Sequence, residues 1–243
     1  MYYILLVCII FIVIYLVYNK NEHFNNNIKI NKTYVINLDS RKDRLQSIDK
    51  DLKKIKLEYE RFPACNGKQI DMYSNDISKY FDKNNKLSPG QIGCSLSHIK
   101  IWEKAIKNNN KYTLVLEDDA IIPSNFNTIL KNSIESLPKN WDLLSFNCSW
   151  CTAKKYNNKL YKLKSNICTL SYLISTKGIK KIFKLLKNKK FNKPIDVYLN
   201  NNFYNNNNCF ITQKSYIYNN GKFNSDINIG NGGSGIHKIK LIN

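Results

Sequence analysis

Acidic residues are scarce in this sequence. The 243-residue chain has 18 Asp and Glu against 38 Lys and Arg, so its net charge is +20. Such an excess favours anionic partners, namely nucleic acid, a membrane surface or phosphorylated small molecules. The lysines are scattered along the whole chain, however, and no block resembles a compact nucleic-acid-binding arm or motif. We therefore interpret the charge as a solvated basic surface and expect no nucleic-acid partner.

The chain also lacks the cysteine and histidine spacing of a zinc-binding module. Cys148 and Cys151 form one C-x-x-C pair, but no second pair and no neighbouring pair of histidines accompanies it. We expect ordinary thiols in a loop, and one disulfide remains an alternative if the domain lies in an oxidising compartment. The apolar fraction of 43% over this length supports the core of one medium-sized domain and argues against global disorder.

Charged side chains are absent from the first eighteen residues, MYYILLVCIIFIVIYLVY. This run is long enough to span a membrane and longer than the apolar part of a typical signal peptide. No small-x-small cleavage site follows, so we expect an uncleaved signal anchor over 1–18, with a cleaved signal peptide as the alternative. A polar stalk over 19–32 would lead to one folded domain over 33–243. The lysines after the span favour a cytosolic domain, but a whole domain follows them, so the side of the membrane stays open.

Beyond the stalk, the apolar pattern alternates between strand and helix. A strand is expected at 34–38 and an amphipathic helix follows it. The clearest helix begins near residue 88, because Ser88 suits the N-cap, Pro89 the first helical position, and Gln91 completes a capping box. Further expected elements are strands within 112–122, 141–146 and 168–175, and helices within 126–137 and 176–188. This alternation predicts an α/β fold with a mostly parallel central sheet and helices on both faces.

Three consecutive acids, Glu117, Asp118 and Asp119, stand at the carboxyl end of one expected strand. In open α/β sheets the ligand crevice lies outside the carboxyl ends of the strands. Alternation along extended backbone lets Glu117 and Asp119 point the same way. Two carboxylates suit a hard cation, Mg²⁺ or Mn²⁺, that also takes phosphate oxygens as ligands. The acids are therefore a candidate site for a metal-bound diphosphate, and an exposed acidic turn is the alternative.

Three sequence blocks taken together resemble glycosyltransferase family 25, the family of lipopolysaccharide-type and procollagen galactosyltransferases. The blocks are YVINLDSRKDR (34–44), LSPGQIGCSLSHIKIWEKAI (87–106) and LVLEDDAII (114–122), and their order and spacing match the family. Weaker similarities follow in CTLSYLISTKGIKKI (168–182), KPIDVYL (193–199) and SDI (225–227). The Asn- and Lys-rich composition and the single short domain resemble a member from a giant virus.

The resemblance implies a glycosyltransferase-A-type nucleotide-binding domain and a defined reaction. Galactose or glucose would pass, with inversion, from a UDP-sugar to a hydroxyl group of a glycan or protein acceptor. A divalent metal, Mn²⁺ or Mg²⁺, would be required. Together with the anchor, this implies a single-pass membrane protein of a host endomembrane or of a virion. A catalytically degenerate relative that serves as a binding or adhesion module is the alternative function.

The resemblance also implies roles for individual acids. Asp119 is the first candidate for a metal ligand, and Glu117 would bind the metal or the ribose of the donor. Asp118 would orient its neighbours or cap the following turn. Asp226 or His237, from the carboxyl-terminal segment, would complete the metal shell.

The residues that the resemblance places beside the nucleotide sugar are Asn37, Arg41, Arg44, Ser97, His98, Glu117 and Asp118. A guanidinium group is well shaped for phosphate, although a solvated helix charge is the alternative for Arg41. Cys94 and His98 lie one helical turn apart, a spacing that suits zinc, but two further ligands are missing. We therefore expect His98 to form part of the wall of the active site.

An inverting transferase needs one general base, and a carboxylate is the usual choice. Asp196 in KPIDVYL is our first candidate, because Pro194 ends a loop before it and a short apolar run follows. Asp142 and Asp226 are the rivals. A helix N-cap is the alternative role for Asp196.

Overall fold

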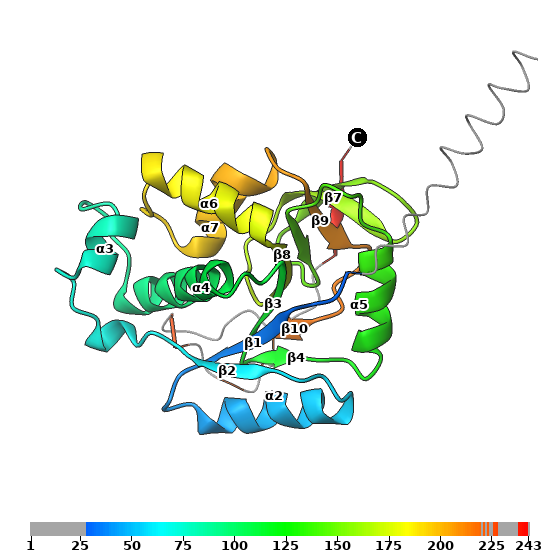
Figure 1. The fold of residues 1–243 in the computed structure, drawn as a ribbon, viewed down its shortest axis with the longest axis horizontal. Helices are drawn as coiled ribbons and strands as arrows, with labels where there is room; N and C mark the ends of the chain where they lie inside the picture. Colours follow the sequence, from blue (N-terminus) through cyan, green and yellow to red (C-terminus); the bar gives the residue numbers. More distant parts are fainter. Residues whose placement is uncertain (1–27, 220, 222, 224–225, 228–237, 243) are drawn as a thin grey trace, which may run out of the picture.

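The computed structural model describes residues 28–219, 221, 223, 226–227 and 238–242 (Figure 1). Within this part, one nine-stranded sheet has the order β11-β6-β7-β9-β5-β8-β3-β1-β2. Its strands are β1 (Lys32–Asn37), β2 (Glu60–Pro63), β3 (Tyr112–Glu117), β5 (Leu143–Ser145), β6 (Thr152–Lys155), β7 (Leu160–Ser165), β8 (Ser171–Ser175), β9 (Cys209–Thr212) and β11 (Lys240–Leu241). A second, two-stranded sheet pairs β4 (Ala120–Ile121) with β10 (Tyr218–Asn219).

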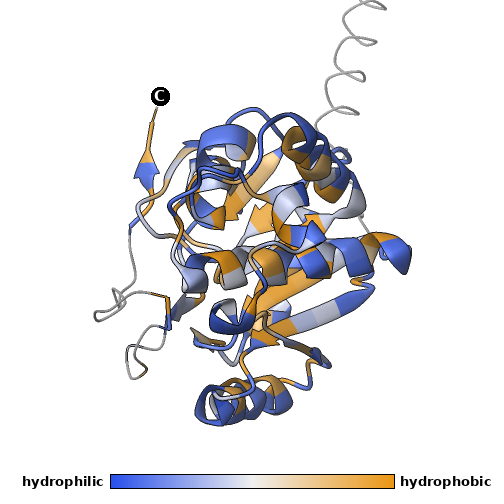
Figure 2. Ribbon diagram, turned by 90° about the vertical axis from the view of Figure 1, so that its left-hand side faces the viewer, coloured by the Kyte–Doolittle hydropathy of each residue, from blue (hydrophilic) through white to orange (hydrophobic). Residues whose placement is uncertain are grey.

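Helices cover both faces of the large sheet, as the sequence predicted (Figure 1). Side chains along β1 alternate between two cores: Val35 packs on the α2 and α5 side, and Tyr34 and Ile36 pack on the α4 and α6 side. Figure 2 shows the apolar strands enclosed by helices with polar outer faces. The helices are α2 (Lys42–Lys54), α3 (Asn75–Tyr80), α4 (Pro89–Lys107), α5 (Phe126–Glu135), α6 (Thr176–Asn188) and α7 (Ile195–Leu199), with the short helices η1 (Gly67–Gln69) and η2 (Asn200–Tyr204).

The predicted α/β class is confirmed, but the prediction of a mostly parallel sheet is wrong. Strand β8 runs antiparallel to both β3 and β5, and β7 runs antiparallel to both β6 and β9. The remaining pairings, β1 with β2 and β3, β5 with β9, and β6 with β11, are parallel. For β6 and β7 the reason lies in their short connection between Lys155 and Leu160, because parallel neighbours need a long crossover.

Helix α4 has the predicted start and holds the loop after β2 in place. The Ser88 hydroxyl accepts a hydrogen bond from the Gln91 backbone N–H at 3.3 Å, and the Gln91 side chain accepts one from the Ser88 N–H at 2.9 Å. One turn on, Gly93 faces the loop, where an added Cβ would lie 2.4 Å from the carbonyl oxygen of Cys65. Only glycine therefore lets this loop lie so close to α4.

Two further expectations concern the cysteine pair and the membrane anchor. Cys148 and Cys151 are joined by a disulfide, so the expectation of ordinary thiols is wrong; the loop after β5 brings their Cα atoms to 5.6 Å, within disulfide range. Among the residues that the structure describes, no helix is long and apolar enough to cross a membrane. The predicted anchor, residues 1–18, lies outside the described residues, as do residues 19–27 of the predicted stalk.

Candidate functional site

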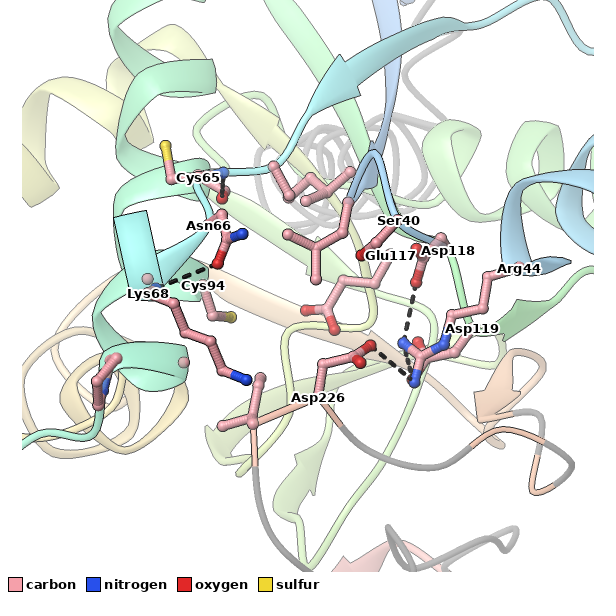
Figure 3. A pocket seen from close by; sticks show the side chains of 18 of the residues that line it. Ser40, Arg44, Cys65, Asn66, Lys68, Cys94, Glu117, Asp118, Asp119 and Asp226 are labelled. Carbon is pink, nitrogen blue, oxygen red and sulfur yellow. Dashed lines mark hydrogen bonds and ion pairs between the residues drawn. The ribbon is translucent and has the colours of Figure 1, made fainter. Parts of the chain in front are cut away.

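A pocket of about 620 Å³ lies where β1, β2 and β3 end (Figure 3). The loop after β1, the loop after β2, the start of α4 and the three consecutive acids after β3 line it, and residues 226–227 close one side. This is the edge at which open α/β sheets bind ligands, and the volume suits a small molecule. The pocket therefore lies at the edge of the sheet where the sequence predicted the candidate site.

Asp118 links the ends of β1 and β3 to helix α2. Its side chain accepts hydrogen bonds from Asn37 Nδ2 at 2.7 Å and from Arg44 Nη1 at 3.1 Å. Asp118 and Arg44 are both buried, at 7% and 6% exposure. Burial raises the pKa of Asp118, and the contacts with Asn37 and Arg44 oppose that rise. The carboxylate thus fixes Arg44, which lines the pocket, and the buried Asn37 at the end of β1.

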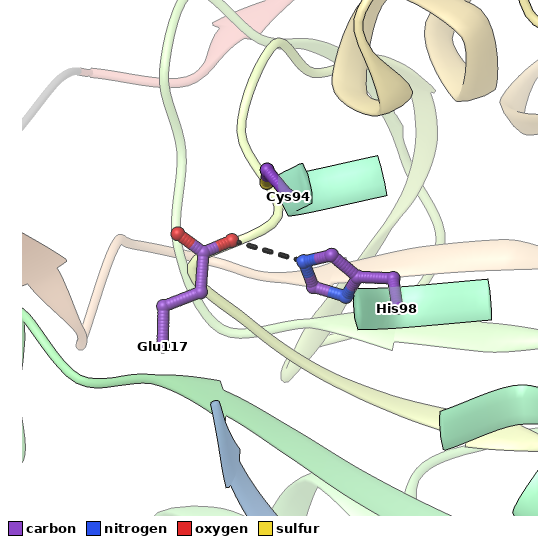
Figure 4. Close-up of side chains that lie close together, drawn as sticks. All are labelled: Cys94, His98 and Glu117. Carbon is purple, nitrogen blue, oxygen red and sulfur yellow. Dashed lines mark hydrogen bonds and ion pairs between the residues drawn. The ribbon is translucent and has the colours of Figure 1, made fainter. Parts of the chain in front are cut away.

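Glu117 is held through one of its two carboxylate oxygens (Figure 4). Its Oε1 accepts a hydrogen bond from Thr169 Oγ1 at 2.8 Å and lies 3.3 Å from His98 Nε2. Burial would raise the pKa of Glu117, but the contacts with His98 and Thr169 and the charge of Arg44 together outweigh burial, and the pKa is lowered below its ordinary value. Glu117 is therefore a carboxylate at neutral pH. Figure 3 shows it directed into the pocket, so Oε2 is the oxygen offered to a ligand.

Asp119 lies in the turn between β3 and β4. Its Oδ2 accepts a hydrogen bond from Asn219 Nδ2 at 2.6 Å and lies 3.6 Å from Arg44 Nη1. Its Oδ1 is buried and has no hydrogen-bond partner among the described residues. Burial, together with the charge of Glu117, raises the pKa of Asp119 to about 7. A buried carboxylate oxygen without a partner is costly, and a divalent cation is the kind of ligand that would satisfy it. The oxygen donors of Glu117 and Asp119 therefore fit Mn²⁺ or Mg²⁺.

The predicted metal shell of Glu117, Asp119 and Asp226 is not gathered into one group. Asp226 is instead bound by two arginines: its Oδ2 lies 2.6 Å from Arg41 Nη1 and 3.3 Å from Arg44 Nη2. These ion pairs satisfy the carboxylate of Asp226 at the mouth of the pocket. His237, the other residue predicted for this shell, lies outside the described residues.

A different group of potential ligands does come together. Cys94, His98 and Glu117 place one ligand atom each within 4.8 Å of one another, and no other such group of three occurs in the part of the chain that the structure describes. The sequence indicated the pair on α4, but not the carboxylate that β3 adds to it. Sequence spacing within one helix is visible in the chain, whereas a partner from a neighbouring strand is not.

Asp142 lies at the opposite edge of the sheet from the pocket. It directly precedes β5, and its backbone carbonyl accepts a hydrogen bond from the N–H of Ser175, the last residue of the antiparallel strand β8. Its fully buried side chain accepts hydrogen bonds from Lys181 Nζ and, at 2.9 Å, from the Asn208 N–H. The rival assignment of Asp142 as the base is therefore corrected: this carboxylate pairs with Lys181 at the amino end of β5.

Asp196 lies close to the site but does not line the pocket. It belongs to the first turn of α7, where Pro194 occupies the N-cap position, so the alternative of an Asp196 N-cap does not apply. Its Oδ1 accepts a hydrogen bond from the Val197 N–H at 2.8 Å. Burial raises the pKa of Asp196, and the charge of Glu117 adds to the rise. A raised pKa is the direction in which enzymes shift a carboxylate that acts as a general base.

Two residues at the site carried no signal in the sequence. Lys68, in the loop after β2, extends its amino group into the pocket (Figure 3). Thr169, in the segment before β8, donates a hydrogen bond to Glu117. Loops that meet only in the folded chain supply these two residues, so no local pattern could identify them.

Ser97, which was expected beside the nucleotide sugar, lines the pocket and supports the loop after β2. Its hydroxyl accepts a hydrogen bond from the Cys65 N–H at 2.8 Å and donates one to the Gly93 carbonyl at 2.7 Å.

Replacing Asp119 by asparagine should stabilise the metal-free protein at pH 8 and much less at pH 4. The pKa of Asp119 is about 7 in the folded chain, above its ordinary value of 3.8. Folding therefore takes up a proton between these pH values, and above them the ionised carboxylate opposes folding. Asparagine removes that cost, so we expect a gain of at least about 1 kcal/mol at pH 8 that shrinks toward zero near pH 4. Urea unfolding in EDTA measures both differences; destabilisation at pH 8 would contradict the raised pKa.

The sequence is similar to those of known proteins over more than half of its length. The sequence profile described as "Glycosyltransferase family 25 (LPS biosynthesis protein)" matches residues 30–163. A "Glycosyltransferase 25 family member" of Anopheles gambiae is 31% identical over 192 residues, which cover 71% of this chain and 31% of that protein. A "Putative glycosyltransferase" of Haemophilus influenzae is 28% identical over 173 residues, which cover 67% of this chain and 60% of that protein.

A vertebrate protein is also similar to this chain. "Procollagen galactosyltransferase 2" of Mus musculus is 27% identical over 168 residues, which cover 61% of this chain and 27% of that protein. The matched region spans about a third of the length of the mosquito relatives, 31% and 30%.

Proposed function

The chain belongs to glycosyltransferase family 25, and on this basis we propose that it transfers a hexose, galactose or glucose, from a UDP-sugar to a hydroxyl group of a glycan or protein. The observation that carries the proposal is the pair of carboxylates at the end of β3. Glu117 points into the pocket, and Asp119 keeps a buried oxygen without a hydrogen-bond partner among the described residues. Together they form a site for a divalent cation at the edge where a nucleotide would bind.

The pocket also has groups of the right kind for the rest of a sugar nucleotide. Lys68 reaches into it and would contact the diphosphate as a point charge (Figure 3). Arg44 also lines the pocket and is held there by Asp118, which accepts a further hydrogen bond from the buried Asn37. A divalent cation held by Glu117 and Asp119, when bound, would neutralise the charge that develops on the leaving diphosphate.

The acceptor hydroxyl must lose its proton as the sugar is transferred. Asp196 is the carboxylate that we propose for this step, because it lies near Glu117 and burial raises its pKa. A single base of this kind suits one direct displacement, which would invert the configuration at the sugar carbon. The carboxylate of Asp226 is already engaged by ion pairs with Arg41 and Arg44, so we do not assign it this role.

Calorimetric titration of the full chain with UDP, with and without Mn²⁺, tests the proposal. We expect UDP to bind much more tightly when Mn²⁺ is present, and we expect hydrolysis of UDP-galactose or UDP-glucose in a donor screen under the same conditions. If UDP does not bind in a metal-dependent way, the chain is a degenerate relative that serves as a binding module.

Replacing Asp196 by asparagine should lower turnover by about 100-fold, because general-base catalysis contributes roughly 10²–10⁴-fold. UDP binding in the presence of Mn²⁺ should stay at the wild-type level, since Asp196 does not line the pocket. Transfer assays and calorimetry on the same preparation measure the two quantities. A loss of UDP affinity with unchanged turnover would remove Asp196 from the role of base.

We also propose that residues 1–18 anchor the domain to a membrane, on the ground of their uncharged apolar sequence. The disulfide between Cys148 and Cys151 favours a domain on the lumenal side, because disulfides persist in oxidising compartments. The lysines after the apolar run favour the opposite side. Protease protection of the domain in sealed microsomes would decide between the two orientations.

A further inference from the structure

We infer that Cys94, His98 and Glu117 form a binding site for Zn²⁺ that shares Glu117 with the site proposed for Mn²⁺ or Mg²⁺ and inhibits it. Cys94 and His98 come from successive turns of α4, and Glu117 comes from the end of β3 (Figure 4). Their sulfur, nitrogen and oxygen ligand atoms all lie within 4.8 Å of one another. All three residues line the pocket, so an ion can reach them from solvent.

The chemistry of the three ligands selects the ion. Mg²⁺ and Mn²⁺ prefer oxygen ligands, whereas thiolate and imidazole suit Zn²⁺. Three protein ligands with a fourth position open to a cavity are the arrangement of zinc sites that keep an exchangeable water. As the bond between Cys94 Sγ and zinc forms, the thiol proton leaves to solvent.

The surroundings of His98 already suit a zinc ligand. His98 is fully buried, and its Nδ1 lies 2.8 Å from the hydroxyl oxygen of Tyr172. Trp102 Nε1 donates a hydrogen bond to the same hydroxyl at 3.0 Å, and the rings of His98 and Tyr172 are stacked with their centroids 5.7 Å apart. These contacts fix the ring, and a hydrogen bond from Nδ1–H to Tyr172 leaves Nε2 as the nitrogen directed at an ion beside Glu117.

The consequence for transfer follows from Glu117, which both sites need. Zinc at Nε2 and Sγ would replace the contact between His98 and Glu117 and would occupy a carboxylate that the proposed donor site uses. Zinc binding itself does not depend on the proposed transferase function, whereas its inhibitory effect rests on that function. Micromolar zinc should therefore oppose the binding of UDP with Mn²⁺ at this pocket.

Titration of the full chain with Co²⁺, without nucleotide, tests the site, because cobalt bound to a thiolate gives an intense charge-transfer absorption band. We expect the band in the wild type, its displacement by Zn²⁺, and at least tenfold weaker cobalt binding in Cys94→Ser. Cys168→Ser is the matched control, since it removes another thiol near Glu117 and should keep the band. Cys94→Ala replaces Cys94→Ser if thermal unfolding shows that the serine variant is not folded.

Three outcomes overturn the inference: no band in the wild type, a band that survives in both Cys94 variants, or a band lost only in Cys168→Ser.

A second measurement tests inhibition: Zn²⁺ should weaken UDP binding with Mn²⁺ by at least tenfold in the wild type and by less than twofold in Cys94→Ser, each compared with the same protein without zinc. Failure of the cobalt experiment removes the zinc site alone, whereas absence of UDP binding with Mn²⁺ removes the proposed function alone.

Discussion

Asp119→Asn should lower the rate of hexose transfer by at least about 100-fold, the loss that follows removal of one preorganised electrostatic group from an active site. Asparagine keeps the size of the side chain and can still contact Asn219, but it carries no negative charge to hold a divalent cation. The buried Oδ1, which has no hydrogen-bond partner among the described residues, is the atom whose charge is removed. Transfer from the UDP-sugar with Mn²⁺ measures the rate, and calorimetry should show that UDP binding no longer depends on Mn²⁺.

The control for this variant is Glu135→Gln, which removes one negative charge from the exposed side of α5, away from the pocket. Its rate should stay within about twofold of the wild type, because surface charges have small effects. Thermal unfolding should show that Asp119→Asn remains folded. Wild-type turnover in Asp119→Asn would end the assignment of this residue as a metal ligand.

Arg44→Met should destabilise the protein by about 3–5 kcal/mol, the cost of leaving a buried charge without its partner. Arg44 lies 3.1 Å from Asp118, 3.6 Å from Asp119 and 3.3 Å from Asp226 through its two terminal nitrogens. Methionine fills much of the same volume but leaves these carboxylates facing one another. Urea denaturation at pH 8 measures the change in the free energy of unfolding.

Two further variants show whether charge is the cause. Asp118→Asn in the Arg44→Met background should recover a substantial part of the loss, because it removes the most deeply buried of the orphaned charges. Lys53→Met, on the same helix α2, breaks an exposed ion pair with Asp49 and should change stability by no more than about 0.5 kcal/mol. If Arg44→Met and Lys53→Met cost the same, the three carboxylates do not depend on Arg44.

The local features of the chain were predictable because neighbouring residues determine them. The capping box at Ser88 and Gln91 lies within one helical turn, and the side chain of each residue accepts a hydrogen bond from the backbone N–H of the other. The strand that ends in Glu117 could be placed from its run of apolar residues. Since ligands gather at the carboxyl ends of such strands, the edge of the sheet that forms the pocket followed as well.

The partners of each acid could not be predicted in the same way. Asp118 and Asp226 are residues of the same type, and nothing near them in the sequence names their partners. In the fold, Asp118 is buried and bonded to Asn37, whereas Asp226 pairs with Arg41 at the mouth of the pocket. Asp142 was a rival of Asp196 for the role of base, but it lies at the amino end of β5, paired with Lys181. The direction of β8, which decided that the sheet is mixed, likewise depends on connections rather than on the composition of the strand.

From the sequence alone came the α/β class, the position of the acidic cluster at a strand end, and membership of a family of transferases. Only the tertiary structure decided which carboxylates meet which cations, that Glu117 joins Cys94 and His98, and that Lys68 reaches the pocket. The physical reason is the range of the interactions. Hydrogen bonds along a helix and the alternation of a strand act between near neighbours in the chain, whereas charges and metal ligands act between side chains that only the packed sheet and helices bring together.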